Sequence, residues 1–427
     1  MSPADKRLPA ILGGSPAVTL DQTAALRWPL LDERDEQAVL DVMRGGDITT
    51  AGVLRALESD YAELTGRRHA LSHNNGTSGL LAAFWAIGLQ PGDEVIVQSA
   101  TFWASALPML WLGALPVFCE SETERLGPCP DEVEARITDR TRALVVTHLW
   151  GMPARMTELL DIAKRHNLRV IEDASHAHGA TWRGRACGAL GDVSVMSLQG
   201  DKLAPAGEGG MLLCDDDELL ERATCLGDIT RIIELQSPAR RFAATSFGVK
   251  TRMAPLSAAV GRVQLAKLGA HNARRNESIR WLSEALEPLG LQTFLPPEHI
   301  ERVYFEFLVR CPPERSPLPA DVLCAALEQE GCLVSAPRYP LLHQQPFFTE
   351  GHFADIARLG SEHVTPTYDP TALPLTQAAN TQLLKLPSFP DAERPLLEQY
   401  VEAFTKVITH ADAIAKHCAD EPLASAP

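Results

Sequence analysis

The chain has 427 residues, of which 45% are hydrophobic and 22% charged, an ordinary composition for a soluble protein of roughly two to four domains. Its formal net charge of −16 at pH 7 argues against nucleic-acid partners and favours a protein that handles small molecules. Because no apolar stretch is long enough for a secretory signal or a membrane span, and the nine cysteines form no C-x-x-C pair, we expect a cytoplasmic protein without membrane partners, disulfides or zinc.

The first two thirds of the chain predict one large α/β domain. An N-terminal arm, residues 1–21, precedes two amphipathic helical stretches within residues 22–66. From about residue 70 to 225, helix-length stretches such as GTSGLLAAFWAIGL and RMTELLDIAKRHN alternate with strand-length apolar runs, which are EVIVQ, PVFCE, ALVVTHLW, LRVIED and VSVMSL. This alternation predicts a mostly parallel sheet covered on both faces, with ligands bound beyond the carboxyl ends of the strands.

The remainder predicts a smaller domain. Two further helical stretches lie within residues 256–290, and a strand-like YFEFLVR and the helices DVLCAALEQEG and ERPLLEQYVEAFTKVITHA follow. The Pro- and aromatic-rich residues 337–353 predict a loop. We therefore place a large domain at residues 22–275, a small α+β domain at 276–412 and a loose tail at 413–427.

Lys202 is the first candidate for chemistry. It lies in the glycine-rich segment SLQGDKLAPAGEGG, residues 197–210, which begins at the end of a predicted strand. A lysine in such a loop can form a Schiff base with a carbonyl, but most lysines are solvated surface residues. The spacing alone leaves these two interpretations evenly matched.

A second pair of candidates follows the run LRVIED. Asp173 ends this run, where an aspartate either caps a helix or holds a protonated pyridine nitrogen. His176 is either an ordinary loop histidine or a hydrogen-bond donor to a cofactor's phenolic oxygen. We expect no metal, because nothing near the H-x-H pair of residues 176–178 completes a ligand set.

An upstream turn, NNGTSGL at residues 74–80, precedes an apolar helix. The free N–H groups at the start of a helix bind phosphate, although Thr77 or Ser78 could equally be an ordinary cap. Phe102, after the run EVIVQ, is either a core residue or a stacking partner for a flat ring. The lysine, the aspartate and this turn together supply the groups that pyridoxal phosphate needs.

In order and spacing, these segments resemble the DegT/DnrJ/EryC1/StrS family of pyridoxal phosphate-dependent enzymes. The resemblance runs from about residue 20 to 275 and includes PGDEVIVQSATFWASA, VIEDASHAHGATWRGRACGALGD, SLQGDKLAPAGEGG and SAAVGRVQL. It implies an α/β protein of fold type I, like aspartate aminotransferase, with a large mostly parallel-sheet domain and a smaller C-terminal α+β domain. DASHAHGA and SLQ-x-x-K are most similar to 3-amino-5-hydroxybenzoate synthases and cyclitol aminotransferases.

The resemblance also implies a role for each matching residue. Lys202 would bind the cofactor covalently and act as general acid and base. Asp173 would pair with the pyridinium nitrogen, and His176 would lie near the phenolic oxygen. The other cofactor-binding residues would be Gly76, Thr77, Ser78 and Ser197 at the phosphate and Phe102 stacked on the ring.

Two segments depart from the family pattern. The family commonly has Asn-x-Arg where a segment reaches the phosphate bound by the neighbouring subunit, whereas this chain has Lys250-Thr251-Arg252. Lys250 is therefore expected to contact that phosphate as a point charge. Residues 338–343, in the substrate loop, match no motif.

The resemblance implies a homodimeric aminotransferase that moves an amino group from an amino acid, glutamine or glutamate, to a keto-sugar, keto-cyclitol or related small carbonyl compound in a secondary-metabolite or antibiotic pathway. One alternative keeps the cofactor but eliminates water and aromatises a ring, as 3-amino-5-hydroxybenzoate synthases do, or replaces a β- or γ-substituent. An alternative of another class is a catalytically silent regulator on the same fold. A nucleotide-dependent dehydrogenase also fits the sheet, but the glycine fingerprint is missing.

Overall fold

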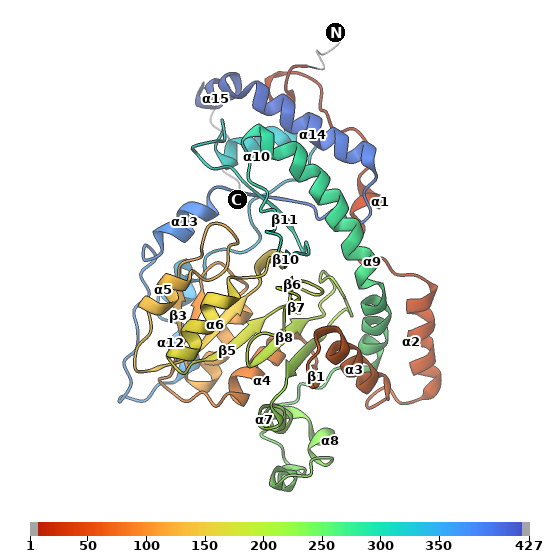
Figure 1. Cartoon of the computed structure of the whole chain (residues 1–427), viewed down its shortest axis with the longest axis vertical. Helices are drawn as coiled ribbons and strands as arrows, with labels where there is room; N and C mark the ends of the chain where they lie inside the picture. Colours follow the sequence, from red (N-terminus) through yellow and green to blue (C-terminus); the bar gives the residue numbers. More distant parts are fainter. Residues whose placement is uncertain (1–6, 421–427) are drawn as a thin grey trace.

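The computed structural model describes residues 7–420 and contains one large sheet with helices on both faces (Figure 1). The seven strands have the order β1-β9-β8-β5-β4-β2-β3. Neighbours from β3 to β8 pair in parallel, while β9 is antiparallel to both β8 and β1. The strands are β1 (His69–His73), β2 (Glu94–Gln98), β3 (Leu115–Cys119), β4 (Thr141–Thr147), β5 (Arg169–Asp173), β8 (Val193–Ser197) and β9 (Gly210–Cys214). This topology confirms the predicted mostly parallel sheet.

Two of these strands, β1 and β9, were missed in the prediction. The sequence of β1, HALSH, has a polar residue at three of its five positions, and β9, GMLLC, begins inside the glycine-rich segment after Lys202. Pairing with each other and with β8 gives both strands their hydrogen bonds. Such long-range pairing overrides weak local propensity.

The central strands are apolar throughout because both faces of the sheet are covered. Successive side chains of a strand point to opposite faces, so Val95 and Val97 pack beneath α4 (Gly76–Ala86) and α7 (Asp217–Gly227). Ile96, between them, packs on the other face near α5 (Pro130–Ala135) and α6 (Met156–Arg165). Each such buried side chain contributes about 1.5–3 kcal/mol.

A smaller unit packs beyond one end of the sheet (Figure 1). It contains the antiparallel pair β11 (Phe307–Arg310) and β12 (Leu383–Leu386), which packs with α10 (Ala320–Gln329) and α14 (Arg394–Thr409). The two helical stretches expected within residues 256–290 form one continuous helix, α9 (Pro255–Leu286). The predicted domain boundary at residue 275 thus falls inside α9.

The two ends of the chain also differ from a simple arm and a loose tail. Backbone N–H groups of Ala10 and Ala17 donate to the carboxylate of Glu330 at 2.7 and 2.8 Å, so the arm packs on the small unit. Within the predicted tail, residues 413–420 belong to helix α15 (Ala411–Asp420), and the rest lies outside the described residues. The loop expected at residues 337–353 contains two short helical turns, η7 (Leu342–Gln344) and α11 (Pro346–Thr349).

The remaining elements are short or flank the sheet. They are η1 (Ala10–Leu12), α1 (Thr23–Leu26), α2 (Glu33–Gly45), α3 (Val53–Thr65), η2 (Trp103–Ser105), η3 (Leu107–Leu112), η4 (Leu149–Gly151), β6 (Thr181–Trp182), β7 (Arg185–Ala186), α8 (Ile229–Ile232), η5 (Pro238–Phe242), η6 (Glu287–Leu289), β10 (Ile300–Glu301), α12 (Phe353–Ala357) and α13 (Pro374–Asn380). Among the residues described, no helix has the length and apolarity that a membrane crossing requires.

Candidate active site

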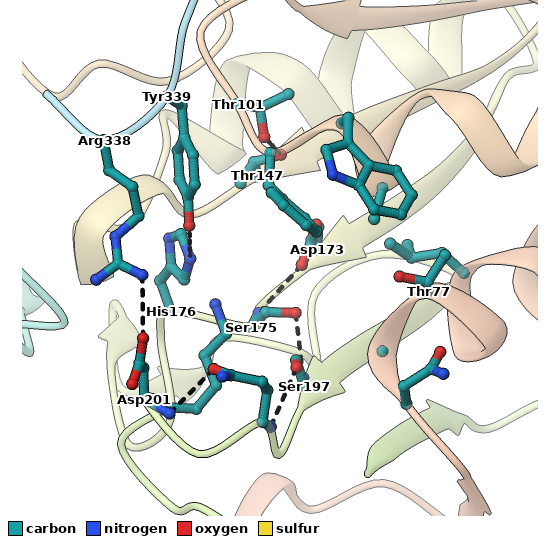
Figure 2. Close-up of a pocket in the computed structure, with 18 of the residues that line it drawn as sticks. Thr77, Thr101, Thr147, Asp173, Ser175, His176, Ser197, Asp201, Arg338 and Tyr339 are labelled. Atoms are coloured by element: carbon teal, nitrogen blue, oxygen red, sulfur yellow. Dashed lines mark hydrogen bonds and ion pairs between the residues drawn. The ribbon is translucent and has the colours of Figure 1, made fainter. Parts of the chain in front are cut away.

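A cavity of about 610 Å³, which we call cavity 1, opens beyond the carboxyl ends of the parallel strands (Figure 2). Asp173 is the last residue of β5, Ser197 the last of β8, and Gly76 the first of α4. All three line cavity 1 together with Lys202. The strand order therefore brings four of the predicted site residues together from distant parts of the sequence.

Asp173 is buried, but its hydrogen-bonding capacity is only partly used. The hydroxyl of Ser105 donates to Oδ2 at 2.6 Å, and the backbone N–H of Ser175 donates to Oδ1 at 3.2 Å. A carboxylate has about four lone-pair positions, so Asp173 keeps acceptor capacity on the side that faces the cavity. This capacity suits a ligand that presents an N–H group.

Glu172, the preceding residue of β5, is hydrogen-bonded on the opposite face of the strand. Its carboxylate accepts from the imidazole of His148 at 2.9 Å and from the backbone N–H groups of Gly188, Leu190 and Gly191 at 2.6 to 2.8 Å. Burial alone would raise the pKa of Glu172, but these hydrogen bonds hold that pKa below its usual value. His148 carries its proton on Nε2, because Nδ1 accepts from the N–H of Ala154 at 3.2 Å.

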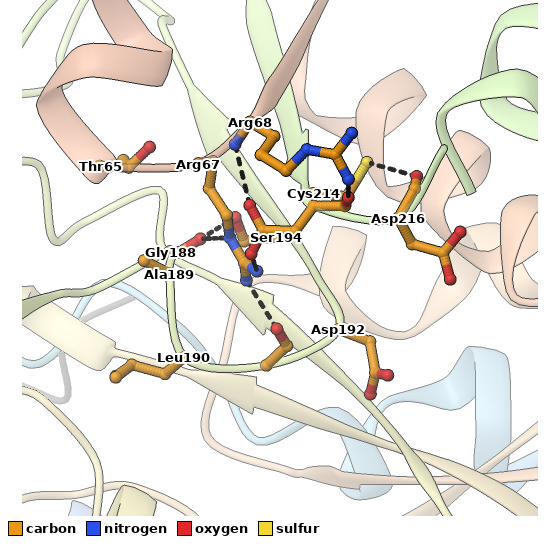
Figure 3. A network of polar contacts seen from close by, with 12 residues as sticks. Thr65, Arg67, Arg68, Gly188, Ala189, Leu190, Asp192, Ser194, Cys214 and Asp216 are labelled. Atoms are coloured by element: carbon orange, nitrogen blue, oxygen red, sulfur yellow. Dashed lines mark hydrogen bonds and ion pairs between the residues drawn. The ribbon is translucent and has the colours of Figure 1, made fainter. Parts of the chain in front are cut away.

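Arg67 ties the same loop to the edge of the sheet (Figure 3). Its guanidinium donates to the carbonyl groups of Gly188 and Gly191 at 2.9 and 2.6 Å and to the carboxylate of Asp215 at 2.8 Å. Arg67 therefore holds in place the loop whose N–H groups donate to Glu172. The end of β5, and with it Asp173, is held by a network that does not itself reach the cavity.

Lys202 projects its amine into cavity 1 and is only 9% exposed. Burial lowers the pKa of its amine to about 8, against the opposing effect of the negative charge on Asp173. The amine lies 4.3 Å from the ring centroid of Phe305, and the backbone carbonyl of Lys202 accepts from the indole of Trp28 at 3.1 Å. A neutral amine is therefore accessible near physiological pH, as carbonyl chemistry requires.

His176 is fixed by rings on several sides. Its ring stacks on the ring of Phe305 with the centroids 4.1 Å apart, and the backbone N–H of Trp150 donates to its Nδ1 at 3.3 Å. Burial holds the pKa of His176 well below its usual value, so the ring is neutral and carries its proton on Nε2. Nε2 then donates to the hydroxyl oxygen of Tyr339 at 3.2 Å.

Tyr339 and Arg338 also line cavity 1, and neither was predicted as a site residue. Arg338 donates to Glu306 at 2.5 Å. It also donates to Asp201 at 3.2 Å (Figure 2), which joins the small unit to the glycine-rich segment that carries Lys202. Both residues come from the predicted loop at residues 337–353. An arginine next to a tyrosine in a Pro- and aromatic-rich loop was the available signal.

The start of α4 forms a cradle that fits the phosphate of the expected cofactor. A Cβ atom on Gly76 would lie 2.8 Å from the Cβ of Ser197, and one on Gly210 would lie 2.4 Å from the carbonyl oxygen of Asn75. The backbone is therefore open only because these positions are glycine. N–H groups in the first turn have no intrahelical acceptor, and those of Gly76 and Thr77 lie at the cavity wall.

Of three further predicted cofactor-binding residues, two lie outside cavity 1 and one lies on its wall. The N–H of Ser78 donates to the side chain of Asn75 at 2.8 Å, and Ser78 lines a neighbouring apolar groove instead of cavity 1. Lys250 is exposed and does not line cavity 1. Phe102 does line it, 37% exposed and 5.7 Å from the ring of Tyr339.

Comparison with known proteins gives consistent matches. The family model for DegT/DnrJ/EryC1/StrS aminotransferases matches residues 29–405. The GDP-perosamine synthase of Caulobacter vibrioides is 37% identical over 269 residues, which are 63% of this chain and 71% of that protein. A pleiotropic regulatory protein of Geobacillus stearothermophilus is 31% identical over 90% of this chain and 99% of its own length.

Solved structures match over nearly the whole chain. DesV of S. venezuelae is 30% identical with a TM-score of 0.77, covering 93% of this chain and 99% of its own. The 3-amino-5-hydroxybenzoic acid synthase is 25% identical with a TM-score of 0.78, covering 94% of this chain and 100% of its own.

Proposed function

The chain belongs to the DegT/DnrJ/EryC1/StrS aminotransferase family, and we propose that it transfers an amino group from glutamine or glutamate to a keto-sugar, keto-cyclitol or related compound. Membership confirms the predicted fold type I, the cofactor pyridoxal phosphate and the class of aminotransferase. The relative named GDP-perosamine synthase supports a sugar as acceptor. The observation that carries the proposal is that Lys202, Asp173 and the first turn of α4 face one cavity.

Each residue then has a distinct task. When bound, pyridoxal phosphate supplies an electron sink for the charge that develops on the substrate carbon. Asp173 would hold the proton on the ring nitrogen, and Lys202 would provide the amine that holds the cofactor and serves as general acid and base. The first-turn N–H groups of Gly76 and Thr77, with Ser197, hold the phosphate.

His176 acts through Tyr339 in this proposal. Because the Nε2–H group of His176 donates to the hydroxyl oxygen of Tyr339, the hydroxyl proton of Tyr339 is left to donate into cavity 1. The phenolic oxygen of the cofactor is the acceptor that we propose. Phe102 covers the ring at the cavity wall.

The decisive experiment is a half-reaction. The holoenzyme is incubated with glutamine or glutamate without any keto acceptor, and absorbance follows the conversion of the cofactor from its aldehyde to its amine form. We expect conversion with at least one of these donors and none in the Lys202→Ala variant, whose fold is checked by circular dichroism. A cofactor that stays in the aldehyde form with every amino acid would contradict transamination.

Two alternatives have specific support. The structural match to 3-amino-5-hydroxybenzoic acid synthase favours the dehydration and aromatisation alternative, and the relative named a pleiotropic regulatory protein favours the regulator. An enzyme of the first kind would form product from its substrate without any amino donor. A silent regulator would neither convert the cofactor nor turn over any substrate.

A cytoplasmic homodimer is the last part of the proposal. Lys250 is exposed and lies outside cavity 1 of its own subunit, which leaves it available to the phosphate of a neighbouring subunit. Sedimentation equilibrium of the holoenzyme would test the assembly. In a Lys250→Ala variant we expect weaker retention of the cofactor, and retention equal to that of the parent would contradict the contact.

A further inference from the structure

A second cavity, of about 360 Å³, lies next to cavity 1 and is called cavity 2 here. Asp201 and Arg338 line both cavities, so the ion pair between them (Figure 2) lies where the two spaces adjoin. The far side of cavity 2 is lined by Trp28, by Arg275 of α9 and by Lys385 of β12. Of these three residues, Trp28 has a contact described above, its hydrogen bond to the backbone carbonyl of Lys202, whereas Arg275 and Lys385 have no role in the site around cavity 1.

Arg275 is the residue whose environment indicates a bound ligand. Its side chain is 2% exposed, its guanidinium lies 3.9 Å from the ring centroid of Trp28, and its Nε and Nη1 atoms have no hydrogen-bond partner within residues 7–420. Burial lowers the pKa of Arg275 to about 10, so the group stays charged at neutral pH. A buried charge without a hydrogen-bond acceptor is destabilising, the ring of Trp28 accepts no hydrogen bond from Nε or Nη1, and an anion in cavity 2 would supply the missing acceptor.

The other charges in cavity 2 leave a positive excess. The two carboxylates of the lining, Glu306 and Asp201, are both engaged by Arg338. Lys385, which is half-buried, forms no ion pair within 4.0 Å across the described part of the chain. The charge on Lys385 opposes the rise that burial causes in the pKa of Glu306, and Oε2 of Glu306 has no hydrogen-bond partner among the described residues. Neither Arg275 nor Lys385, however, has a carboxylate within ion-pair distance in that part of the chain, and both face the same space.

We propose that cavity 2 binds a compact oxyanion, a phosphate or a carboxylate, between Arg275 and Lys385. The guanidinium offers two donors in a fixed fork, and the ammonium adds a point charge. The volume of 360 Å³ exceeds that of a phosphate with a few waters of about 30 Å³ each, so a small organic group fits with the anion. The proposal does not rest on the transamination proposed above, because neither cation lines cavity 1.

The test uses holoenzyme saturated with pyridoxal phosphate, so that the phosphate cradle at α4 is filled. Inorganic phosphate is titrated by isothermal calorimetry in a phosphate-free buffer, and a second titration uses glutarate, which has two carboxylates and no amine to react with the cofactor. We expect saturable binding of phosphate by the parent protein. Loss of one charge-assisted contact in Lys385→Ala should raise the Kd about tenfold, and Arg275→Gln should abolish binding.

The matched control is Lys416→Ala, which removes the same charge from an exposed position on α15 and should leave the Kd unchanged. Absence of saturable phosphate binding, or equal affinity in Lys385→Ala and the control, would overturn the proposal. Should Arg275→Gln fail to fold, Lys385→Glu replaces it and must weaken binding more than Lys385→Ala does. Competition between glutarate and phosphate shows that the site also accepts a carboxylate, and its absence shows that the site selects phosphate; both results uphold the site.

Discussion

Glu172 and Asp173 are consecutive carboxylates at the end of β5, and they differ in how far protein donors satisfy them. Glu172 accepts four hydrogen bonds and faces a loop clamped by Arg67, whereas Asp173 accepts two and faces cavity 1. A saturated carboxylate stabilises the fold, while an under-saturated one is available to a ligand. The difference teaches that burial alone does not identify a functional acid; the number of unused acceptor positions does.

The largest effect should come from removing the charge that faces the cavity. Asp173→Asn keeps an acceptor for Ser105 but cannot sustain a protonated ring nitrogen, so we expect kcat to fall about 10³-fold, as for loss of a key electrostatic contact. Circular dichroism should show an unchanged fold. If the Asp173→Asn enzyme kept the kcat of the parent, Asp173 would have no more of a role in catalysis than Glu172, and the contrast drawn between the two carboxylates would be wrong.

The neighbouring carboxylate should show the opposite pattern. Glu172→Gln leaves the backbone N–H groups of Gly188, Leu190 and Gly191 without a charged acceptor, so the free energy of unfolding should fall by about 3–5 kcal/mol. Urea unfolding followed by fluorescence measures this loss, while kcat of the protein that remains folded should change only a few-fold. A large drop in kcat at unchanged stability would contradict a structural role.

The free energy of unfolding at low pH should also reveal the structural role of Glu172. Because the pKa of Glu172 is lower in the folded state, the unfolded state binds more protons as pH falls, and this stabilisation is present above the unfolded pKa and lost as pH falls through the folded one. Below about pH 4.5, the stability of the parent should fall more steeply than that of Glu172→Gln, by up to about 1.4 kcal/mol per pH unit. Parallel acid curves for the two proteins would exclude this contribution.

The amine on the cavity side should titrate in the alkaline range. Since burial lowers the pKa of Lys202 to about 8, only the neutral fraction attacks an aldehyde. The rate at which cofactor-free protein takes up pyridoxal phosphate covalently should rise about tenfold per pH unit below that pKa and level off above it. Stopped-flow absorbance measures this rate, and a midpoint near the ordinary lysine pKa would show that the amine is solvated.

The smallest effect is expected at the open wall of cavity 1. Phe102→Leu removes an aromatic face worth about 0.5–1.5 kcal/mol, so cofactor loss on dialysis should become a few-fold faster while kcat stays close to that of the parent. Trp111→Leu, at an exposed aromatic outside cavity 1, serves as the control. Equal retention in all three proteins would show that the ring of Phe102 does not contact the cofactor.

The local sequence pattern was sufficient to predict those site residues whose positions follow from the topology of the sheet. Asp173, Ser197 and Gly76 each adjoin a strand end or a helix start, and parallel strands carry such positions to one edge. Arg338 and Tyr339 could not be predicted in the same way, because a loop of the small unit brings them to the cavity. Arg275 lies on a predicted helix, but its unpaired state depends on Trp28 and β12, which only the folded chain brings near it.

The continuity of α9 has a mechanical consequence. Near the start of α9, Gly261 lies against the glycine-rich segment that carries Lys202, because a Cβ on Gly261 would be 3.2 Å from the Cβ of Ala206. The last turns of α9 pack in the core of the small unit. A helix of 32 residues behaves as a stiff rod of about 48 Å. Because α9 is continuous, any tilt of the small unit would be transmitted along the helix. The same tilt would displace the glycine-rich segment, whose backbone carries Lys202.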